Sequence, residues 1–150
     1  MSNEMMKKIY IGSDHGGFDL KEEVKEFLAE KFAGFEVKDL GCDSAESVDY
    51  PEFGKAVGEA VIADKDSLGI VICGSGVGIG IAANKVEGIR CVTANSTELA
   101  KLGREHNGAQ VLAMGARTLF MNDWWDIVET FLTTEMDEGD RHKRRRCQLG

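Results

Sequence analysis

The residues best suited to chemistry in this chain are a cysteine and the glycines that follow it. Cys73 ends an apolar run, and Gly74, Gly76, Gly78 and Gly80 follow it on alternate positions. The apolar run predicts a buried strand of a parallel sheet that delivers the thiol at its carboxyl end. Alternate glycines let several backbone N–H groups approach one anion, and a helix predicted over residues 81–85 adds positive potential there.

Two interpretations of Cys73 follow from the residues alone. A thiolate beside such an anion-binding loop can remove a proton from carbon or attack carbon. Alternatively, Cys73 is a small buried hydrophobic side chain, as most free cysteines are. The glycine pattern favours the catalytic interpretation. The loop matches neither the dinucleotide-binding Gly-x-Gly-x-x-Gly pattern, whose last position is Ile79 or Ile81, nor a P-loop, since Lys85 follows Asn84.

Asp14 and His15 lie on a predicted turn between a strand and a helix. A carboxylate beside an imidazole can position sugar hydroxyls there, and an imidazolium can bind phosphate. The alternative is structural, with Asp14 or Ser13 capping a helix. Because ligands of parallel α/β folds bind at the carboxyl ends of strands, we expect this turn and Cys73 to share one edge of the sheet.

Further along the chain, His106 could shuttle a proton and Asn107 could donate an amide hydrogen bond to an oxyanion, or both could occupy a solvated helix end. Arg141 and Arg145 are four residues apart, so a helix would place both guanidinium groups on one face, where they could clamp a phosphate. The alternative is again a solvated helix end. Arg117 could add a third phosphate contact or form a surface pair.

Strand-like and helix-like segments alternate along the chain. Strand-like runs occur at residues 8–12, 35–40, 68–73, 89–94 and 110–114. Helical spacing of apolar residues occurs between these runs, Ser96 could cap a short helix, and Asn122 could cap a later one. This order predicts a single α/β domain over residues 1–150 with helices on both faces of a parallel sheet. We expect residues 1–7 to be flexible and a C-terminal helix over about residues 137–150.

Composition limits the function further. The formal net charge of −8 argues against nucleic acid or an anionic membrane as the main partner. No apolar run is long enough to span a bilayer, and no signal peptide is evident, which predicts a cytoplasmic protein. The four cysteines form no paired motif, so we expect free thiols. No spacing of His, Cys, Asp or Glu suggests a metal site.

Together these motifs resemble those of type B ribose-5-phosphate isomerases, a family shared with galactose-6-phosphate isomerase subunits. The likeness runs from about residue 8 to residue 146. It rests on the motifs at residues 13–17, 49–51, 72–78, 81–85, 104–107 and 141–142. The resemblance implies a Rossmann-like three-layer sandwich with a five-stranded parallel sheet. It also implies an aldose–ketose isomerase of the pentose phosphate pathway that uses neither a metal nor a cofactor.

The resemblance also implies a role for each motif. Cys73 matches the base that moves a proton between C2 and C1 through an enediolate, and Ser75 the hydroxyl that assists at the sugar oxygens. His106 with Asp14 matches the pair that opens the sugar ring, and Tyr50 a sugar contact. The implied ligands are Gly74, Gly76, Val77, Gly78 and Asn107 for the sugar oxygens, and His15, Arg117, Arg141 and Arg145 for the phosphate.

In the family the site is shared across a homodimer, which often pairs into a tetramer. The resemblance implies that His106, Asn107 and Arg117 come from the neighbouring subunit. Ile79 stands where one branch of the family has a glutamate base, so this chain resembles the cysteine branch. Its retained motifs favour a pentose phosphate over a hexose 6-phosphate such as allose or galactose 6-phosphate. A non-catalytic module that binds phosphate or a nucleotide is the remaining alternative.

The C-terminal segment departs from the family pattern at Asp140, where glycine is frequent before the Arg-His pair. A carboxylate beside Arg141 could weaken phosphate binding or reshape the turn. Lys143, Arg144 and Arg146 exceed the cations that a phosphate needs, and we expect them to offset nearby acidic residues.

Overall fold

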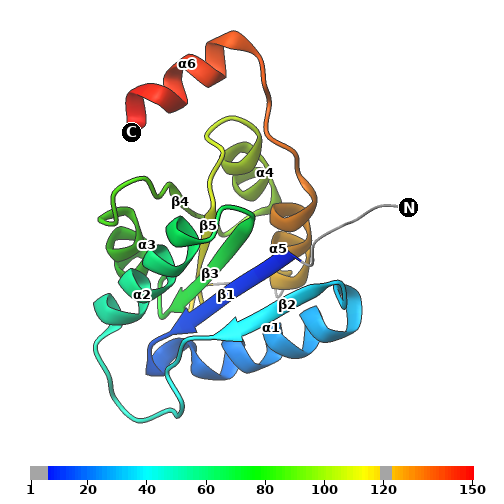
Figure 1. Ribbon diagram of the computed structural model, residues 1–150. Helices are drawn as coiled ribbons and strands as arrows, with labels where there is room; N and C mark the ends of the chain where they lie inside the picture. The colour runs from blue at the N-terminus through cyan, green and yellow to red at the C-terminus, as the bar shows by residue number, and fades with distance from the viewer. Residues whose placement is uncertain (1–6, 119–122) are drawn as a thin grey trace.

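The computed structural model describes residues 7–118 and 123–150, which alternate between strands and helices (Figure 1). The elements in chain order are β1 (Lys7–Ser13), η1 (His15–Gly17), α1 (Phe18–Lys31), β2 (Phe35–Asp39), α2 (Tyr50–Ala63), β3 (Ser67–Cys73), α3 (Val77–Asn84), β4 (Cys91–Thr93), α4 (Thr97–Glu105), β5 (Val111–Gly115), α5 (Trp124–Thr133) and α6 (Asp140–Leu149). Each strand-like run found in the sequence overlaps one of the strands.

The strands form one parallel sheet in the order β2-β1-β3-β5-β4, which confirms the predicted fold class. From β1 the chain crosses to β2 on one side, while β3 lies on the other side of β1. The strand order therefore reverses between β1 and β3, and ligands of such sheets bind outside the carboxyl ends of the strands at this point.

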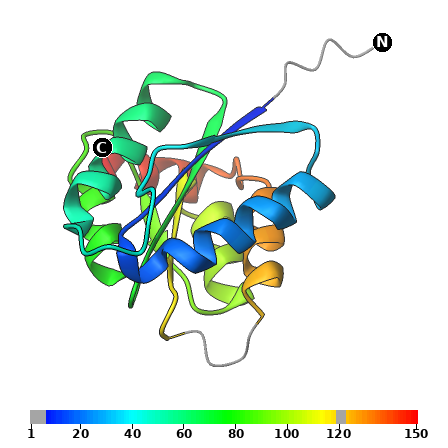
Figure 2. The same cartoon turned by 90° about the horizontal axis from the view of Figure 1, so that it is seen from below.

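Helices cover both faces of the sheet, which gives three layers (Figures 1 and 2). Helices α1, α4 and α5 pack on one face, where Val24, Leu28 and Phe131 are fully buried against the strands. Helices α2 and α3 cover the other face, with Val57 and Ile79 in its core. Buried apolar side chains that point alternately to the two faces explain why the central strands β3 and β5 read as continuous apolar runs.

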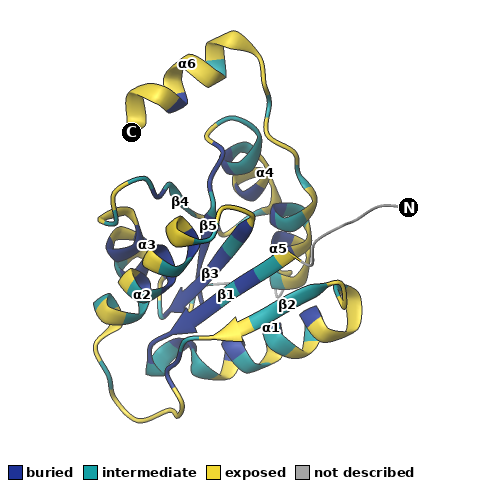
Figure 3. Cartoon of the chain, in the orientation of Figure 1, coloured by how far each residue is buried: buried dark blue, intermediate teal, exposed yellow. Residues whose placement is uncertain are grey.

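Helix α6 projects from the body of the domain, and almost all of its residues are exposed (Figure 3). Its buried residue is Arg146. The helix lies within the range predicted for the C-terminal helix and begins at Asp140. An acidic residue in the first turn suits the positive end of the helix dipole.

Two sequence predictions fall partly or wholly outside the described residues. Of the segment expected to be flexible, residues 1–6 lie outside them, and Lys7 already belongs to β1. The predicted cap Asn122 also lies outside, and α5 follows Asp123. The Ser96 cap is confirmed, since its Oγ accepts a hydrogen bond from Leu99 N at 3.2 Å. Within the described part of the chain, no helix combines the length and the apolar character needed to cross a membrane.

Candidate active site

Strands β1 and β3 bring the first two predicted motifs together at the switch point of the sheet. Ser13 pairs with Ile72, so the turn after β1 lies beside the end of β3. Asp14 N also donates to Ile72 O at 3.2 Å. The expectation that Asp14, His15 and Cys73 share the carboxyl edge of the sheet is therefore confirmed.

Cys73 is buried at the end of β3, where a backbone amide holds its sulfur. Gly76 N donates to Cys73 Sγ at 3.1 Å. An N–H group aimed at sulfur stabilises negative charge there and fixes the direction of the side chain. This contact depends on glycine at position 76, because Gly76 has a φ of +80°, a conformation that only glycine adopts without cost.

The loop after Cys73 presents further donors to the same edge. Ser75 is exposed, and its Oγ accepts a hydrogen bond from Val77 N at 3.2 Å, which places the hydroxyl at the N-terminus of α3. Among the described residues, the backbone N–H groups of Gly74, Ser75 and Gly78 have no acceptor. Unpaired N–H groups at the first turn of a helix can bind an anion, and anion binding by this loop stays a prediction.

The end of β5 supports this loop from one side. Ala116 N donates to Cys73 O and Arg117 N donates to Gly74 O, each at 2.8 Å. The Arg117 guanidinium lies close to the loop and to η1, because a Cβ added to Gly16 would be 3.5 Å from Arg117 Nη2 and also 3.5 Å from Gly74 N. The expected origin of Arg117 in a neighbouring subunit is therefore wrong, since the arginine reaches the loop of its own chain.

Three other predicted residues surround the loop. Asp14 caps η1 as the structural interpretation expected, with its Oδ1 accepting from Gly17 N at 3.1 Å. His15 Nδ1 lies 3.1 Å from Val48 N, a contact that fixes the plane of the imidazole. The Tyr50 ring lies over the first turn of α3, 2.6 Å from where a Cβ on Gly78 would stand. Gly78 is thus required for Tyr50 to approach the loop.

The remaining predicted residues form a second group at the other edge of the sheet. Cys73 is in register with Gly115, the last residue of β5, whereas His106 and Asn107 precede the first residue of that strand. Arg141 and Arg145 lie on exposed positions of α6, which extends beyond the same edge (Figure 1). Within one chain, the structure therefore separates His106, Asn107, Arg141 and Arg145 from Cys73.

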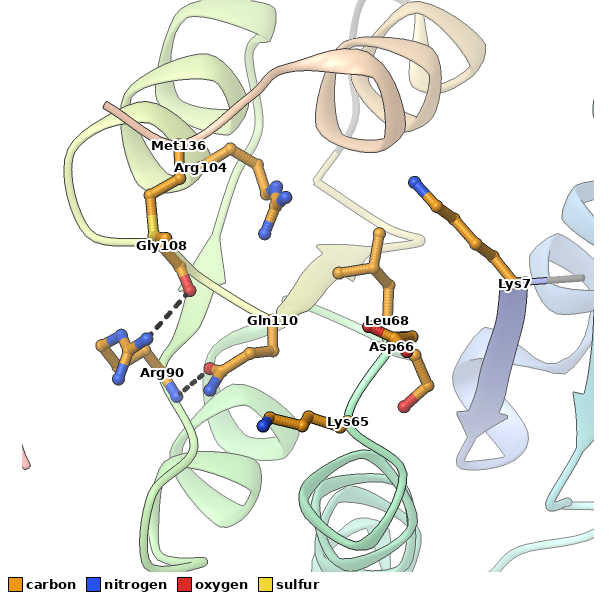
Figure 4. A pocket seen from close by; sticks show the side chains of 10 residues that line it. Lys7, Lys65, Asp66, Leu68, Arg90, Arg104, Gly108, Gln110 and Met136 are labelled. Atoms are coloured by element: carbon orange, nitrogen blue, oxygen red, sulfur yellow. Dashed lines mark hydrogen bonds between the residues drawn. The ribbon is translucent and has the colours of Figure 1, made fainter. Parts of the chain in front are cut away.

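Arg90 fixes the turn that carries Asn107. Its Nε donates to Asn107 O at 2.6 Å, its Nη2 to Gly108 O at 3.3 Å, and its backbone N to Gln110 Oε1 at 2.7 Å. This arginine and Arg104 line a hollow of about 290 Å³ near the amino ends of β3 and β5. Figure 4 shows both side chains. Arg104 Nη1 binds Ala109 O at 2.8 Å, so both arginines serve the conformation of the turn.

Helix α6 contributes two residues whose roles were not recognised in the sequence. Arg146, expected only to offset acidic neighbours, is 7% exposed, and its Nη1 donates to His106 O at 3.0 Å. That expectation is corrected, because the side chain anchors α6 to α4. The ring of His142 stacks on the ring of His106, with the centroids 4.0 Å apart and the planes 8° from parallel. The sequence signal was the placement of His142 and Arg146 one helical turn apart.

Three observations concern groups outside the loop that could take part in chemistry. Burial raises the pKa of Cys91 to about 12, so this thiol stays neutral. Ile79, at the position of the alternative glutamate base, is fully buried in the core. Within residues 7–118 and 123–150, no group of three or more His, Cys, Asp or Glu side chains is arranged to hold a metal ion.

A doubly wound parallel sheet with a buried thiol and a loop of unpaired N–H groups at its switch point defines the class as an α/β protein with a candidate site at the carboxyl ends of its strands. A family model described as Ribose/Galactose Isomerase matches residues 9–149. The chain belongs to this family.

Named relatives and solved structures agree with this assignment. Ribose-5-phosphate isomerase B of Escherichia coli is 45% identical over 140 residues, covering 93% of this chain and 92% of that protein. The enzyme of the same name from Mycolicibacterium paratuberculosis is 45% identical over 92% of this chain and 86% of its own length. The structure of Clostridium thermocellum ribose-5-phosphate isomerase B aligns with a TM-score of 0.89 at 50% identity over 95% of each chain. The Trypanosoma brucei type B enzyme gives 0.92 at 38% identity over 97% of each chain.

Proposed function

We propose that this protein is an aldose–ketose isomerase that interconverts ribose 5-phosphate and ribulose 5-phosphate, with Cys73 as the base. The observation that carries the proposal is the contact of 3.1 Å from Gly76 N to Cys73 Sγ at the head of a loop of unpaired N–H groups. A negative sulfur and a negative enediolate are the two charges that such an isomerisation must stabilise. The identity to named ribose-5-phosphate isomerases supports the choice of substrate.

In the proposed reaction, the Cys73 thiolate removes the proton from C2 of the open-chain aldose and returns it to C1. The electron pair left by the C2–H bond forms the C1–C2 double bond of the enediolate, and the carbonyl oxygen becomes the oxyanion. Backbone N–H groups of residues 74–78 hold that oxyanion. In this proposal Ser75, whose hydroxyl lies at the N-terminus of α3, carries the proton that must pass between O1 and O2.

The phosphate and the sugar ring need residues from both edges of the sheet. His15 and Arg117 lie beside the loop, whereas Arg141, Arg145 and the ring-opening residue His106 lie at the opposite edge of the same chain. We infer that a second copy of the chain places its His106, Asn107, Arg141 and Arg145 over Cys73 of the first. A symmetric dimer then contains two such sites, each formed by the carboxyl edge of one copy and the opposite edge of the other.

Exposed apolar side chains next to the loop support this dimer. Val77 and Ile81 follow each other by one turn of α3 and are 53% and 54% exposed. Tyr50, beside the same turn, is 41% exposed. Burial of exposed apolar side chains against a partner favours association. Helix α6 extends from the body of the domain, where it can reach such a partner (Figure 1).

The proposed function is tested by the conversion of ribose 5-phosphate to ribulose 5-phosphate with EDTA present. We expect turnover by the wild-type chain and a loss of at least about 10²-fold in kcat for Cys73→Ala, because proton transfer by a positioned base contributes that much. Cys91→Ala is the matched control, since Cys91 pairs with Val111 at the start of β5, whereas Cys73 pairs with Gly115 at its end. Near-normal turnover by Cys73→Ala contradicts the role of the base.

The same assay distinguishes the alternative substrates. Allose 6-phosphate and galactose 6-phosphate are offered to the wild-type chain at equal concentrations. A higher kcat/KM for either hexose 6-phosphate than for ribose 5-phosphate contradicts the pentose assignment and leaves the role of Cys73 intact. Binding of these sugar phosphates without any turnover favours the non-catalytic module.

A further inference from the structure

The stacked rings of His106 and His142 are held in place from several sides. Arg146 Nη1 donates to His106 O at 3.0 Å, and Asp137 N donates to Glu105 O at 2.8 Å, so two contacts join the segment around α6 to the end of α4. The side chain of His142 is only 12% exposed, whereas that of His106 is 36% exposed. His142 therefore forms the inner support of the pair, and His106 presents its free face.

The geometry points to His142 as a positioning residue for His106: its ring fixes the plane of the His106 ring and prevents the pair from taking up two protons. This inference rests on the proposed role of His106 in opening the sugar ring. A ring-opening acid–base must meet the sugar oxygen in one orientation, and a parallel neighbour at 4.0 Å excludes most other orientations of the ring.

The charges around the pair disfavour a proton on the inner ring, that of His142. Glu105 Oε1 lies 3.5 Å from His106 Nε2, on the outer ring. On the other ring, burial together with the nearby His106, Arg141 and Arg145 lowers the pKa of His142, although Asp137, at 3.9 Å, opposes this shift. Two parallel imidazolium rings at this distance repel each other, so their protonation is coupled. The result is a stacked pair whose inner ring resists protonation.

Histidine titration by NMR without substrate tests this coupling independently of activity. We expect the pKa of His142 in the wild-type chain to lie below the ordinary value for histidine and to rise in His106→Asn, because the repulsion from the second ring is removed. An unchanged titration of His142 in His106→Asn overturns the coupling. This result does not depend on which substrate the protein uses.

Two substitutions of His142 test the positioning role. His142→Ala removes the supporting face, and we expect kcat for ribose 5-phosphate to fall about tenfold with a smaller change in KM, because the His106 ring loses its orientation. His142→Phe keeps the face without a titrating group. It should retain kcat within about threefold and lose the low-pH step that reports the second proton. Arg144→Ala, an exposed change on the same helix, is the control.

Wild-type values of kcat and an unchanged pH profile in His142→Ala overturn the inference. If the wild-type chain isomerises no sugar phosphate, the proposed function fails instead. The titration then still decides whether the two rings are coupled.

Discussion

Gly76 meets two requirements of the site at once. Its φ of +80° turns the backbone so that its N–H reaches Cys73 Sγ, and its lack of a side chain lets it lie against the end of β5. A Cβ at this position would stand 2.7 Å from Met114 C and 2.9 Å from Gly115 N, both backbone atoms that cannot move aside. The placement of the thiol therefore depends on a residue that carries no chemistry of its own.

Gly76→Ala should lower both stability and activity. We expect a loss of at least about 2 kcal/mol in the free energy of unfolding, from the left-handed conformation and the contact with β5. Urea unfolding and turnover of ribose 5-phosphate measure the two effects. Gly34→Ala is the control, because a Cβ there meets nothing within 4 Å. Equal stability of Gly76→Ala and wild type would show that the loop has another conformation.

At the scale of elements, α1 and β2 are joined by an ion pair between Lys21 and Asp39, in which the lysine is buried inside the domain. The side chain of Lys21 is 1% exposed, and its Nζ lies 2.6 Å from Asp39 Oδ2, which also accepts from Lys25 Nζ at 2.8 Å. Burial alone would raise the pKa of Asp39, but hydrogen bonds from Lys21, Lys25 and Gly41 N outweigh it and lower the pKa. The pair positions β2 beside β1, whose carboxyl end leads to Asp14.

Asp39→Asn should destabilise the fold by roughly 3 kcal/mol, because it leaves the buried ammonium of Lys21 without its closest counter-charge. The matched control is Glu36→Gln on the same strand, which breaks an exposed pair with Lys38 and should change stability by less than about 1 kcal/mol. Chemical unfolding at pH 7 compares the two variants. Similar losses in both would contradict a special role for the buried pair.

The same pair predicts how stability depends on pH. Because the pKa of Asp39 is lowered in the folded state, the unfolded chain binds this proton first as the pH falls. The contribution of Asp39 is complete above its unfolded pKa near 4 and is lost as the pH drops through its folded pKa. Wild type should therefore lose stability more steeply than Asp39→Asn below about pH 4. Parallel slopes would contradict the lowered pKa.

At the scale of the whole molecule, the separation of the two groups of site residues leads to a test of the proposed dimer. Cys73→Ala should be inactive as a purified protein, and His106→Asn should convert ribose 5-phosphate only slowly, because the closed sugar ring then lacks its ring-opening group. When the two are unfolded and refolded together in equal amounts, half of the dimers contain one of each. Each mixed dimer then has one site with both wild-type residues, which restores about a quarter of wild-type activity if dimers are symmetric.

No recovery of activity in the mixed sample would contradict a site shared between copies. The control is the mixture of Cys73→Ala with Ser75→Ala, two changes in the same group, which should not complement each other. Sedimentation of the mixed sample confirms that dimers have formed. The test therefore separates a failure of assembly from a failure of the shared site.

The local chemistry of the site was largely readable from the sequence. Cys73, the glycines after it and the Asp14–His15 turn follow two apolar runs, and parallel strands always bring their carboxyl ends to one edge. The strand and helix pattern was also readable. A strand buried on both faces gives a continuous apolar run, whereas a helix buried on one face repeats its apolar residues about every three to four positions. These features depend on neighbours in the chain, or on rules that hold for every sheet of this kind.

Only the tertiary structure decided how the distant motifs are grouped. Arg117 follows β5 and lies with Cys73, whereas His106 precedes the same strand and lies at the opposite edge. Strand β5 runs between the two residues and takes them to opposite edges of the sheet. The residue types alone do not indicate the edge at which each one lies. The stacking of His142 on His106 and the anchoring by Arg146 likewise depend on where α6 lies against α4. Sequence patterns specify which face of an element is buried, but contacts between elements follow from packing in three dimensions.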